Sequence, residues 1–303
     1  MRKHLTTVLD YFAFFSYAPT LREIHTFYPE SISKKSLSDL LSEGCTRGKL
    51  VRLPKNKVFG LFQQSILNLN LEFESSRYTL PQYSIRVKNK FKFQIQIQDK
   101  KPPQTIQIYL FILRYLLPFV RFVGVTGATA MSGYTPLDDI DLFIITKGGA
   151  LWTSRLYTVL IAKALRIHGG TGVCLNMFFD EDGLSVPKMK QNKYIAHELL
   201  QMKPVIDKTN TYSLLMKANT WIFEFFPNAL VKKIQAPNSN SKKGTTDWIP
   251  AFARMTQKTE RLFRFMQLPI IKKNKTGFRI TDHQLWLFKR DFEKKLKRNG
   301  LGR

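Results

Sequence analysis

The chain has 303 residues, 44% of them hydrophobic, which is enough to bury one sizeable core or two and excludes a wholly disordered protein. Lys and Arg total 48 against 22 Asp and Glu, a formal net charge of +26, so phosphate-bearing partners such as nucleotides or nucleic acid are expected. A generally basic proteome or solvated Lys-rich faces would give the same charge, which therefore assigns no function alone.

Cysteine content and hydropathy bear on the compartment. The only cysteines, Cys45 and Cys174, lie in a predicted helix end and a predicted core strand, so a reducing cytoplasm is expected and a disulfide framework is not. Residues 106–125 are apolar enough to suggest a membrane span. Arg114, Arg121 and Pro118 interrupt them, which favours a buried helix followed by a buried strand, and no membrane partner is expected.

Residues 1–62 predict three short helices and a hairpin. Helical spacing and caps mark the helices, with Thr20 capping the second and Ser36 with Asp39 beginning the third as a capping box. Strands at residues 50–53 and 58–61 then flank a turn. This order predicts a winged-helix-like domain.

Such a domain has two interpretations. Its third helix, residues 36–44, would lie in a DNA major groove while basic side chains bind phosphates, or the domain would serve only for packing and protein contacts. Asp39 and Glu43 leave that helix little with which to read bases. The phosphate-binding candidates are Lys34, Lys35, Arg47, Lys49 and Arg52.

Residues 63–104 alternate between apolar and polar side chains. The runs cover residues 67–73, 85–87 and 91–97, on either side of Pro81. A period of two predicts half-buried strands, so this part is expected to be a β-rich connecting segment.

Residues 105–235 predict the core of the protein. An apolar helix is followed by strands at residues 121–125, 140–146 and 173–179, with a helix at 153–167 between the last two. Helical patterns resume at residues 193–202 and 212–226. The expected fold class is therefore α+β, with a mixed sheet flanked by helices and a C-terminal helical region.

The end of the chain differs in composition. Residues 236–258 are rich in Ser, Asn, Lys and Thr and predict a disordered insertion. Part of it resembles a peptide encoded by dispersed palindromic repeats inside some bacterial genes; the alternative is a short docking segment using Trp248 and Phe252. Residues 259–303 predict a basic helical tail, with an amphipathic helix over residues 282–297.

One stretch carries chemistry. A predicted strand runs into the small-residue turn Thr126, Gly127, Ala128 and Thr129, whose backbone N–H groups are expected to cradle phosphates. Asp139 and Asp141 follow on the next strand, and residues i and i+2 of a strand point to one side. Their paired carboxylates suit Mg²⁺ or Mn²⁺ held against nucleotide phosphates, whereas a strand end capping a turn is the structural alternative.

These residues resemble the polymerase-beta-like nucleotidyltransferase superfamily, whose motif is Gly, a small residue, a gap and Asp-apolar-Asp. Gly127, Ala128, Asp139 and Asp141 match that motif, and the chain is most similar to bacterial proteins that join a winged helix to such a domain. The resemblance implies an NTP as substrate, a metal at Asp139 and Asp141, and an acceptor whose identity is open.

Two positions depart from the superfamily pattern. Ala128 replaces the usual Ser or Gly, which removes a hydroxyl contact that Thr126 or Thr129 would have to supply. The third carboxylate of the superfamily falls on Asn176, which would make Asn176 the third metal position and leaves two-metal catalysis open. Asp180 and Glu181 are further candidates, and Lys147 is a candidate phosphate contact.

Other chemistries find no support. The histidines show no metal-ligand spacing with either cysteine, and His197 with Glu198 lacks the second histidine of a metalloprotease motif, so His197 is expected to be a packing residue. Two hypotheses remain. The chain is a nucleotidyltransferase that moves a nucleoside monophosphate from an NTP to an acceptor hydroxyl, or it is a catalytically weak regulatory protein that binds nucleotide or nucleic acid.

Overall fold

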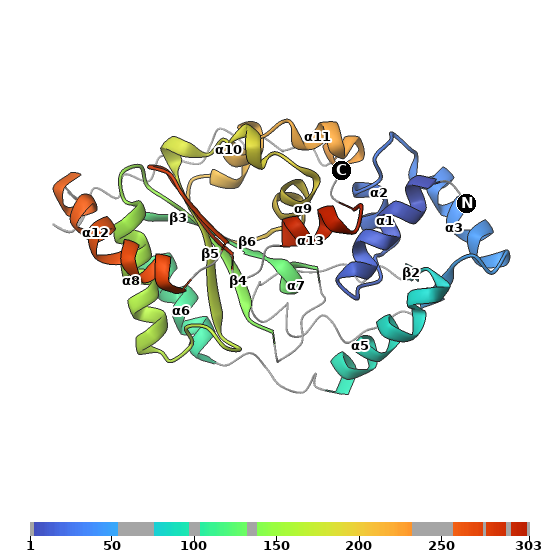
Figure 1. Cartoon of the computed structure of the whole chain (residues 1–303), viewed down its shortest axis with the longest axis horizontal. Helices are drawn as coiled ribbons and strands as arrows, with labels where there is room; N and C mark the ends of the chain where they lie inside the picture. The colour runs from blue at the N-terminus through green and yellow to red at the C-terminus, as the bar shows by residue number, and fades with distance from the viewer. Residues whose placement is uncertain are drawn as a thin grey trace.

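The computed structural model describes residues 3–53, 76–96, 104–131, 138–231, 257–274, 277–288 and 292–301 (Figure 1). Helices cover both faces of one six-stranded mixed sheet, which confirms the predicted α+β class. Among these residues no helix combines the length and the apolar character that crossing a membrane would need.

The sheet has the strand order β6-β3-β4-β5-β8-β7. Its strands are β3 (Val120–Thr126), β4 (Ile140–Thr146), β5 (Val173–Asp180), β6 (Lys203–Asp207), β7 (Gly277–Ile280) and β8 (Gln284–Phe288). β4 and β5 pair in parallel through the crossover helix α8 (Leu151–Ala164), and each of the other described pairs is antiparallel. The predictions of β3, β4, β5 and α8 are confirmed within three residues.

Alternate side chains of β4 enter different cores. Leu142 and Ile144 pack beneath α6 (Gln104–Tyr115), α8 and α12 (Gln257–Asn274). Phe143 and Ile145 face the opposite side of the sheet, where they join the N-terminal helices and the helices that follow β5. Both sides of the central strands are therefore buried.

The N-terminal helices belong to this second core. They are α1 (Lys3–Phe14), α2 (Leu21–Thr26) and α3 (Lys34–Thr46). Thr20 caps α2 as predicted, but α3 begins two residues before the predicted capping box, because Ser33 accepts the N–H of Ser36. The two strands near this unit, β1 (Val51–Leu53) and β2 (Arg77–Thr79), pair antiparallel, and the predicted partner strand at residues 58–61 lies outside the described residues.

His197 joins the N-terminal helices to α9 (Lys193–Gln201). Its ring stacks between the rings of Tyr11 and Phe27, at centroid distances of 3.8 Å and 4.0 Å. It contacts the rings of Phe12 and Phe226 edge-on. Burial lowers the pKa of His197 well below its usual range, so the ring is neutral inside the cluster. The prediction of a packing histidine is confirmed, and the helices α10 (Thr211–Lys217) and α11 (Ile222–Phe225) complete this side.

The strand prediction for residues 85–96 is wrong. Ser84–Gln96 form the helix α5, in which Val87 packs against Ala18 and Leu53 while Ile85 is 74% exposed. A strand in this place would need a neighbouring strand for its backbone groups, whereas a helix pairs them internally. The other predicted runs, at residues 67–73 and at Ile97, lie outside the described residues.

The C-terminal prediction is also partly wrong. Residues 284–288 form β8, which pairs with β5, and within the described part of this stretch the helix, α13, spans Phe292–Arg298. Leu285, Trp286 and Leu287 are buried in succession, because β8 is covered on both faces, and such a strand does not alternate in sequence. Most of the predicted insertion lies outside the described residues, although its last two residues begin α12.

The shared core predicts that the N-terminal helices and the sheet unfold together. Phe12 is 1% exposed and contacts Tyr17, Phe27 and His197, so Phe12→Ala is expected to cost about 3–5 kcal/mol of stability. Urea unfolding followed by tryptophan fluorescence and circular dichroism would measure it. One transition at a lower urea midpoint is expected, and two separate transitions would contradict a shared core; Ile85→Ala is the exposed control.

Candidate metal centre

The predicted acids lie at one end of the central strands. Asp141 pairs with Thr126 of β3 on one side and with Cys174 of β5 on the other. Strand alternation places Asp139 and Asp141 on the side of Phe143, which is the side covered by α9 and the N-terminal helices. The prediction that the two carboxylates share a side is confirmed.

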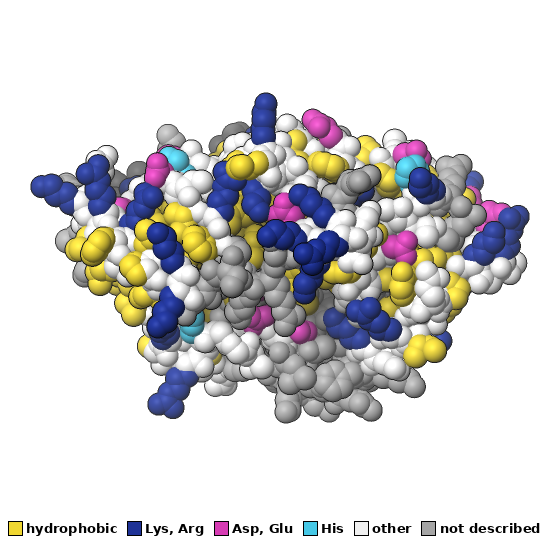
Figure 2. All heavy atoms as spheres, viewed as in Figure 1, with side chains coloured by type: hydrophobic (Ala, Val, Ile, Leu, Met, Phe, Trp, Pro, Cys, Tyr) yellow, Lys and Arg dark blue, Asp and Glu magenta, His cyan; other side chains and the backbone are white. Residues whose placement is uncertain are grey.

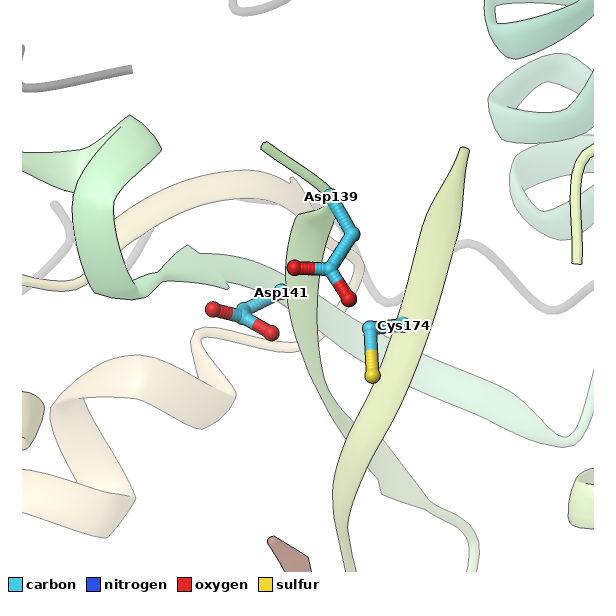
Figure 3. A group of neighbouring side chains, drawn as sticks. All are labelled: Asp139, Asp141 and Cys174. Carbon is cyan, nitrogen blue, oxygen red and sulfur yellow. The ribbon is translucent and has the colours of Figure 1, made fainter. Parts of the chain in front are cut away.

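Three side chains come together there. Ligand atoms of Asp139, Asp141 and Cys174 all lie within 4.8 Å of one another, and Figure 3 shows the Asp139 carboxylate between the other two. Two carboxylates at this separation repel each other unless a cation or a proton lies nearby. Carboxylate oxygens suit Mg²⁺ or Mn²⁺, whereas a thiolate is a ligand for softer metals, so the fit to a hard divalent cation rests on the two acids.

A bulge in β5 brings Asn176 to Asp141. The register passes from Leu142–Leu175 to Phe143–Met177, which leaves Asn176 without a partner on β4. Its side-chain amide donates a hydrogen bond to Oδ1 of Asp141, and its oxygen accepts the thiol of Cys174 at 3.0 Å. The predicted third position is thus brought into the site, where it orients Asp141 by a hydrogen bond.

The glycine turn is fitted against Asp141. Gly127 begins α7 (Gly127–Ala130) with a φ of +64°, a conformation that side chains rarely adopt, and a methyl group there would overlap Oδ2 of Asp141. Thr126 and Thr129, the predicted replacements for a phosphate-binding serine, are 2% and 1% exposed. Only Gly127 and Ala128 are partly open to solvent, so the turn offers backbone rather than hydroxyl contacts.

Glu198 is a residue that the sequence interpretation missed. It lies on α9, is 6% exposed, and its carboxylate accepts a hydrogen bond from the backbone N–H of Gly127. Gln201 adds a longer bond of 3.5 Å, and burial raises the pKa of Glu198 to about 7. The signal in the sequence was an acid among the buried positions of the predicted helix.

Tyr194 interacts electrostatically with several acids around the turn. This tyrosine is buried on α9, and burial together with the nearby charges of Glu198, Asp141 and Glu293 raises its pKa well above the usual value. Burial and Glu198 raise the pKa of Tyr11 in the same way. Two neutral tyrosines, one from the N-terminal helices, therefore lie beside the carboxylates.

A second cluster contains Asp180, Asp182 and His283. His283 Nδ1 lies 3.0 Å from both carboxylate oxygens of the buried Asp180, and this hydrogen bond raises the pKa of the histidine. This hydrogen bond joins the start of β8 to the end of β5, and a metal at the cluster would have to replace it. Glu181 contacts Arg121 at 3.5 Å.

The distance between Lys147 and the paired acids excludes the predicted phosphate contact of Lys147. Lys147 follows β4 at the end opposite to Asp141. Six residues of strand span about 20 Å, which places Lys147 too far from the carboxylates to share a ligand with them.

Comparison with known proteins adds no relative: no family model matches the chain, and neither the curated proteins nor the solved structures give a significant match.

A methyl group at Gly127 is expected to destroy the metal site. Gly127→Ala would push Asp141 from its place, so Mn²⁺ affinity should fall at least tenfold, beyond the cost of about 1 kcal/mol for the backbone conformation. Gly149→Ala is the matched control, because Gly149 also has a positive φ, of +67°, but has open space around it. Calorimetric Mn²⁺ titration of both variants tests this, and equal affinities would contradict the fitted turn.

The raised pKa of Glu198 predicts that the stability of the fold depends on pH. Because its pKa rises from 4.5 to about 7 on folding, its contribution is present at low pH and is lost as pH rises through about 7. Glu198→Gln keeps an acceptor for Gly127 without this loss. Relative to the wild type, the free energy of unfolding of the variant should therefore increase by up to about 3 kcal/mol as the pH is raised from about 5 to about 8, as measured by urea unfolding. A difference in unfolding free energy that stays constant with pH would contradict the prediction.

Proposed function

We propose that the chain is a metal-dependent nucleotidyltransferase of the polymerase-beta-like kind, in which Asp139 and Asp141 bind Mg²⁺ or Mn²⁺. One observation carries this: the two carboxylates and the glycine turn are a single unit, because Gly127 leaves room for Asp141 that no other residue would leave. Paired acids beside a small-residue turn bring a cation and a triphosphate to the same place.

The reaction would transfer a nucleoside monophosphate. An acceptor hydroxyl attacks the α-phosphorus of an NTP, the new oxygen–phosphorus bond forms, the bond to the bridging oxygen breaks, and pyrophosphate leaves while the hydroxyl proton passes to solvent. The bound cation supplies charge neutralisation for the phosphates. The triphosphate would lie against the partly open backbone of Gly127 and Ala128 in the turn Thr126–Thr129, and Asn176 holds Asp141 in its orientation.

A second candidate is a catalytically weak protein that binds nucleotide or nucleic acid in a regulatory role. Asn176 supports it, since an amide stands where a third carboxylate would complete a two-metal site. The arrangement of α1, α2, α3 and the β1–β2 pair supports a winged-helix-like unit, yet its helices are packed into the core of the sheet. A packing role for this unit is therefore favoured over an independent DNA reader.

The proposed activity is tested with labelled NTPs, Mg²⁺ or Mn²⁺ and a panel of hydroxyl acceptors. Wild-type protein should transfer label, and Asp139→Asn with Asp141→Asn should lower the rate at least a hundredfold, because the cation loses both charged ligands. Asp182→Asn, in the second cluster, should retain the wild-type rate.

Equal labelling by wild type and the Asp139→Asn, Asp141→Asn protein would exclude catalysis at this site. Metal-dependent NTP binding without transfer to any acceptor would instead favour the regulatory candidate. Loss of transfer in Asp182→Asn alone would move the metal centre to the second cluster.

A further inference from the structure

Two basic helices lie beside the candidate site on one face of the molecule. α5 carries Arg86, Lys88, Lys90 and Lys92 and has no acid between Ser84 and Gln96. α13 carries four cations and one acid. Figure 1 places α7 between these two helices, and Figure 2 shows Lys and Arg side chains over both regions of the face.

α5 approaches the acids through Lys90. The Lys90 ammonium donates to the carbonyl of Phe15 at 3.3 Å, and burial lowers its pKa while the nearby Asp138 raises it. The hydrogen bond holds Lys90 at the end of α1, from where its charge interacts with that of Asp138, the residue before the paired carboxylates. Arg86 and Lys88, on the same helix, are exposed to solvent.

α13 approaches the acids from the other side. The ring of its Phe292 lies 6.5 Å from the ring of Tyr194 on α9, and the charges of Glu293 and Asp141 both raise the pKa of that tyrosine. The carboxylate of Glu293 is itself occupied, because it accepts hydrogen bonds from Lys190 at 2.7 Å and from Asn192 at 2.9 Å. Lys297 also lies 3.8 Å from this carboxylate, and the net outward charge of α13 comes from the exposed Lys294, Lys295, Lys297 and Arg298.

The end of α1 joins the two helices. The carbonyl of Phe15 receives Lys90 of α5, and the ring of Phe15 contacts Phe292 of α13 at a centroid distance of 5.7 Å. The two basic helices therefore share one contact residue, Phe15. The N-terminal helices thereby acquire a role at the site that does not require them to read DNA.

We propose that α5 and α13 bind the phosphodiester backbone of a single-stranded nucleic acid and guide its end to Asp139 and Asp141, so that this strand is the acceptor. The proposal rests on the proposed function for the chemistry at the strand's end. The positive charge itself is widespread in this chain, and it is the placement of these two helices beside the acids that selects a strand leading into the site. An acidic protein would match the sign of the charge but would lack the regularly spaced phosphates of a nucleic-acid strand.

Binding is tested without turnover by fluorescence anisotropy with labelled single-stranded RNA and DNA, at several salt concentrations. Arg86→Glu with Lys88→Glu, and separately Lys297→Glu with Arg298→Glu, should each weaken binding about tenfold or more and flatten the salt dependence. Arg86→Gln with Lys88→Gln removes the two positive charges without adding negative ones, so it should weaken binding less. Lys272→Glu with Lys273→Glu is the matched control, because these exposed residues of α12 lie on the opposite side of the sheet.

Equal weakening by the α12 control, no weakening by either site pair, or equal competition by polyglutamate would overturn the proposed surface. Preference for RNA or DNA identifies the strand in either case. Asp139→Asn with Asp141→Asn should bind the strand at least as tightly as wild type. Failure of transfer with intact binding would therefore refute the proposed function while leaving the surface in place.

Discussion

The arrangement depends on the close approach of Gly127 to two acids. Its missing side chain leaves room for Oδ2 of Asp141, and its N–H bonds the buried carboxylate of Glu198. One residue at the end of β3 thus contacts β4 through Asp141 and α9 through Glu198. Since α9 also carries His197 into the aromatic cluster of the N-terminal helices, α9 links those helices to the candidate metal centre.

Charge is distributed in a way that fits a phosphate substrate. Asp139, Asp141 and Glu198 lie around the turn, where burial keeps Glu198 protonated until about pH 7 and keeps Tyr11 and Tyr194 neutral. Cations occupy the helices outside that centre. A phosphate chain in the site would meet a metal held by Asp139 and Asp141 rather than a group of bare carboxylates, and its extension would meet α5 and α13.

Much of the centre of the molecule could be predicted, because β3, β4 and β5 are apolar runs and the acids fall at i and i+2 of a strand. The contribution of Glu198 could not, since it reaches Gly127 only after α9 has packed across the sheet. The strand prediction for Ser84–Gln96 failed for a physical reason. Its side chains alternate as in a strand, but its backbone forms its hydrogen bonds internally, in a peripheral helix. β8 was mistaken for helix because a strand buried on both faces loses its period, and β6 was missed because it is an edge strand containing Pro204.

The central claim is that one cation and one triphosphate meet at Asp139, Asp141 and the Gly127 turn. Crystals grown with Mn²⁺ and a non-hydrolysable NTP analogue test it directly, by anomalous diffraction. We expect a manganese peak between the carboxylates of Asp139 and Asp141, with the phosphates against the backbone of Gly127 and Ala128. A peak at Asp180, Asp182 and His283 instead, or nucleotide bound away from the turn, would contradict the account.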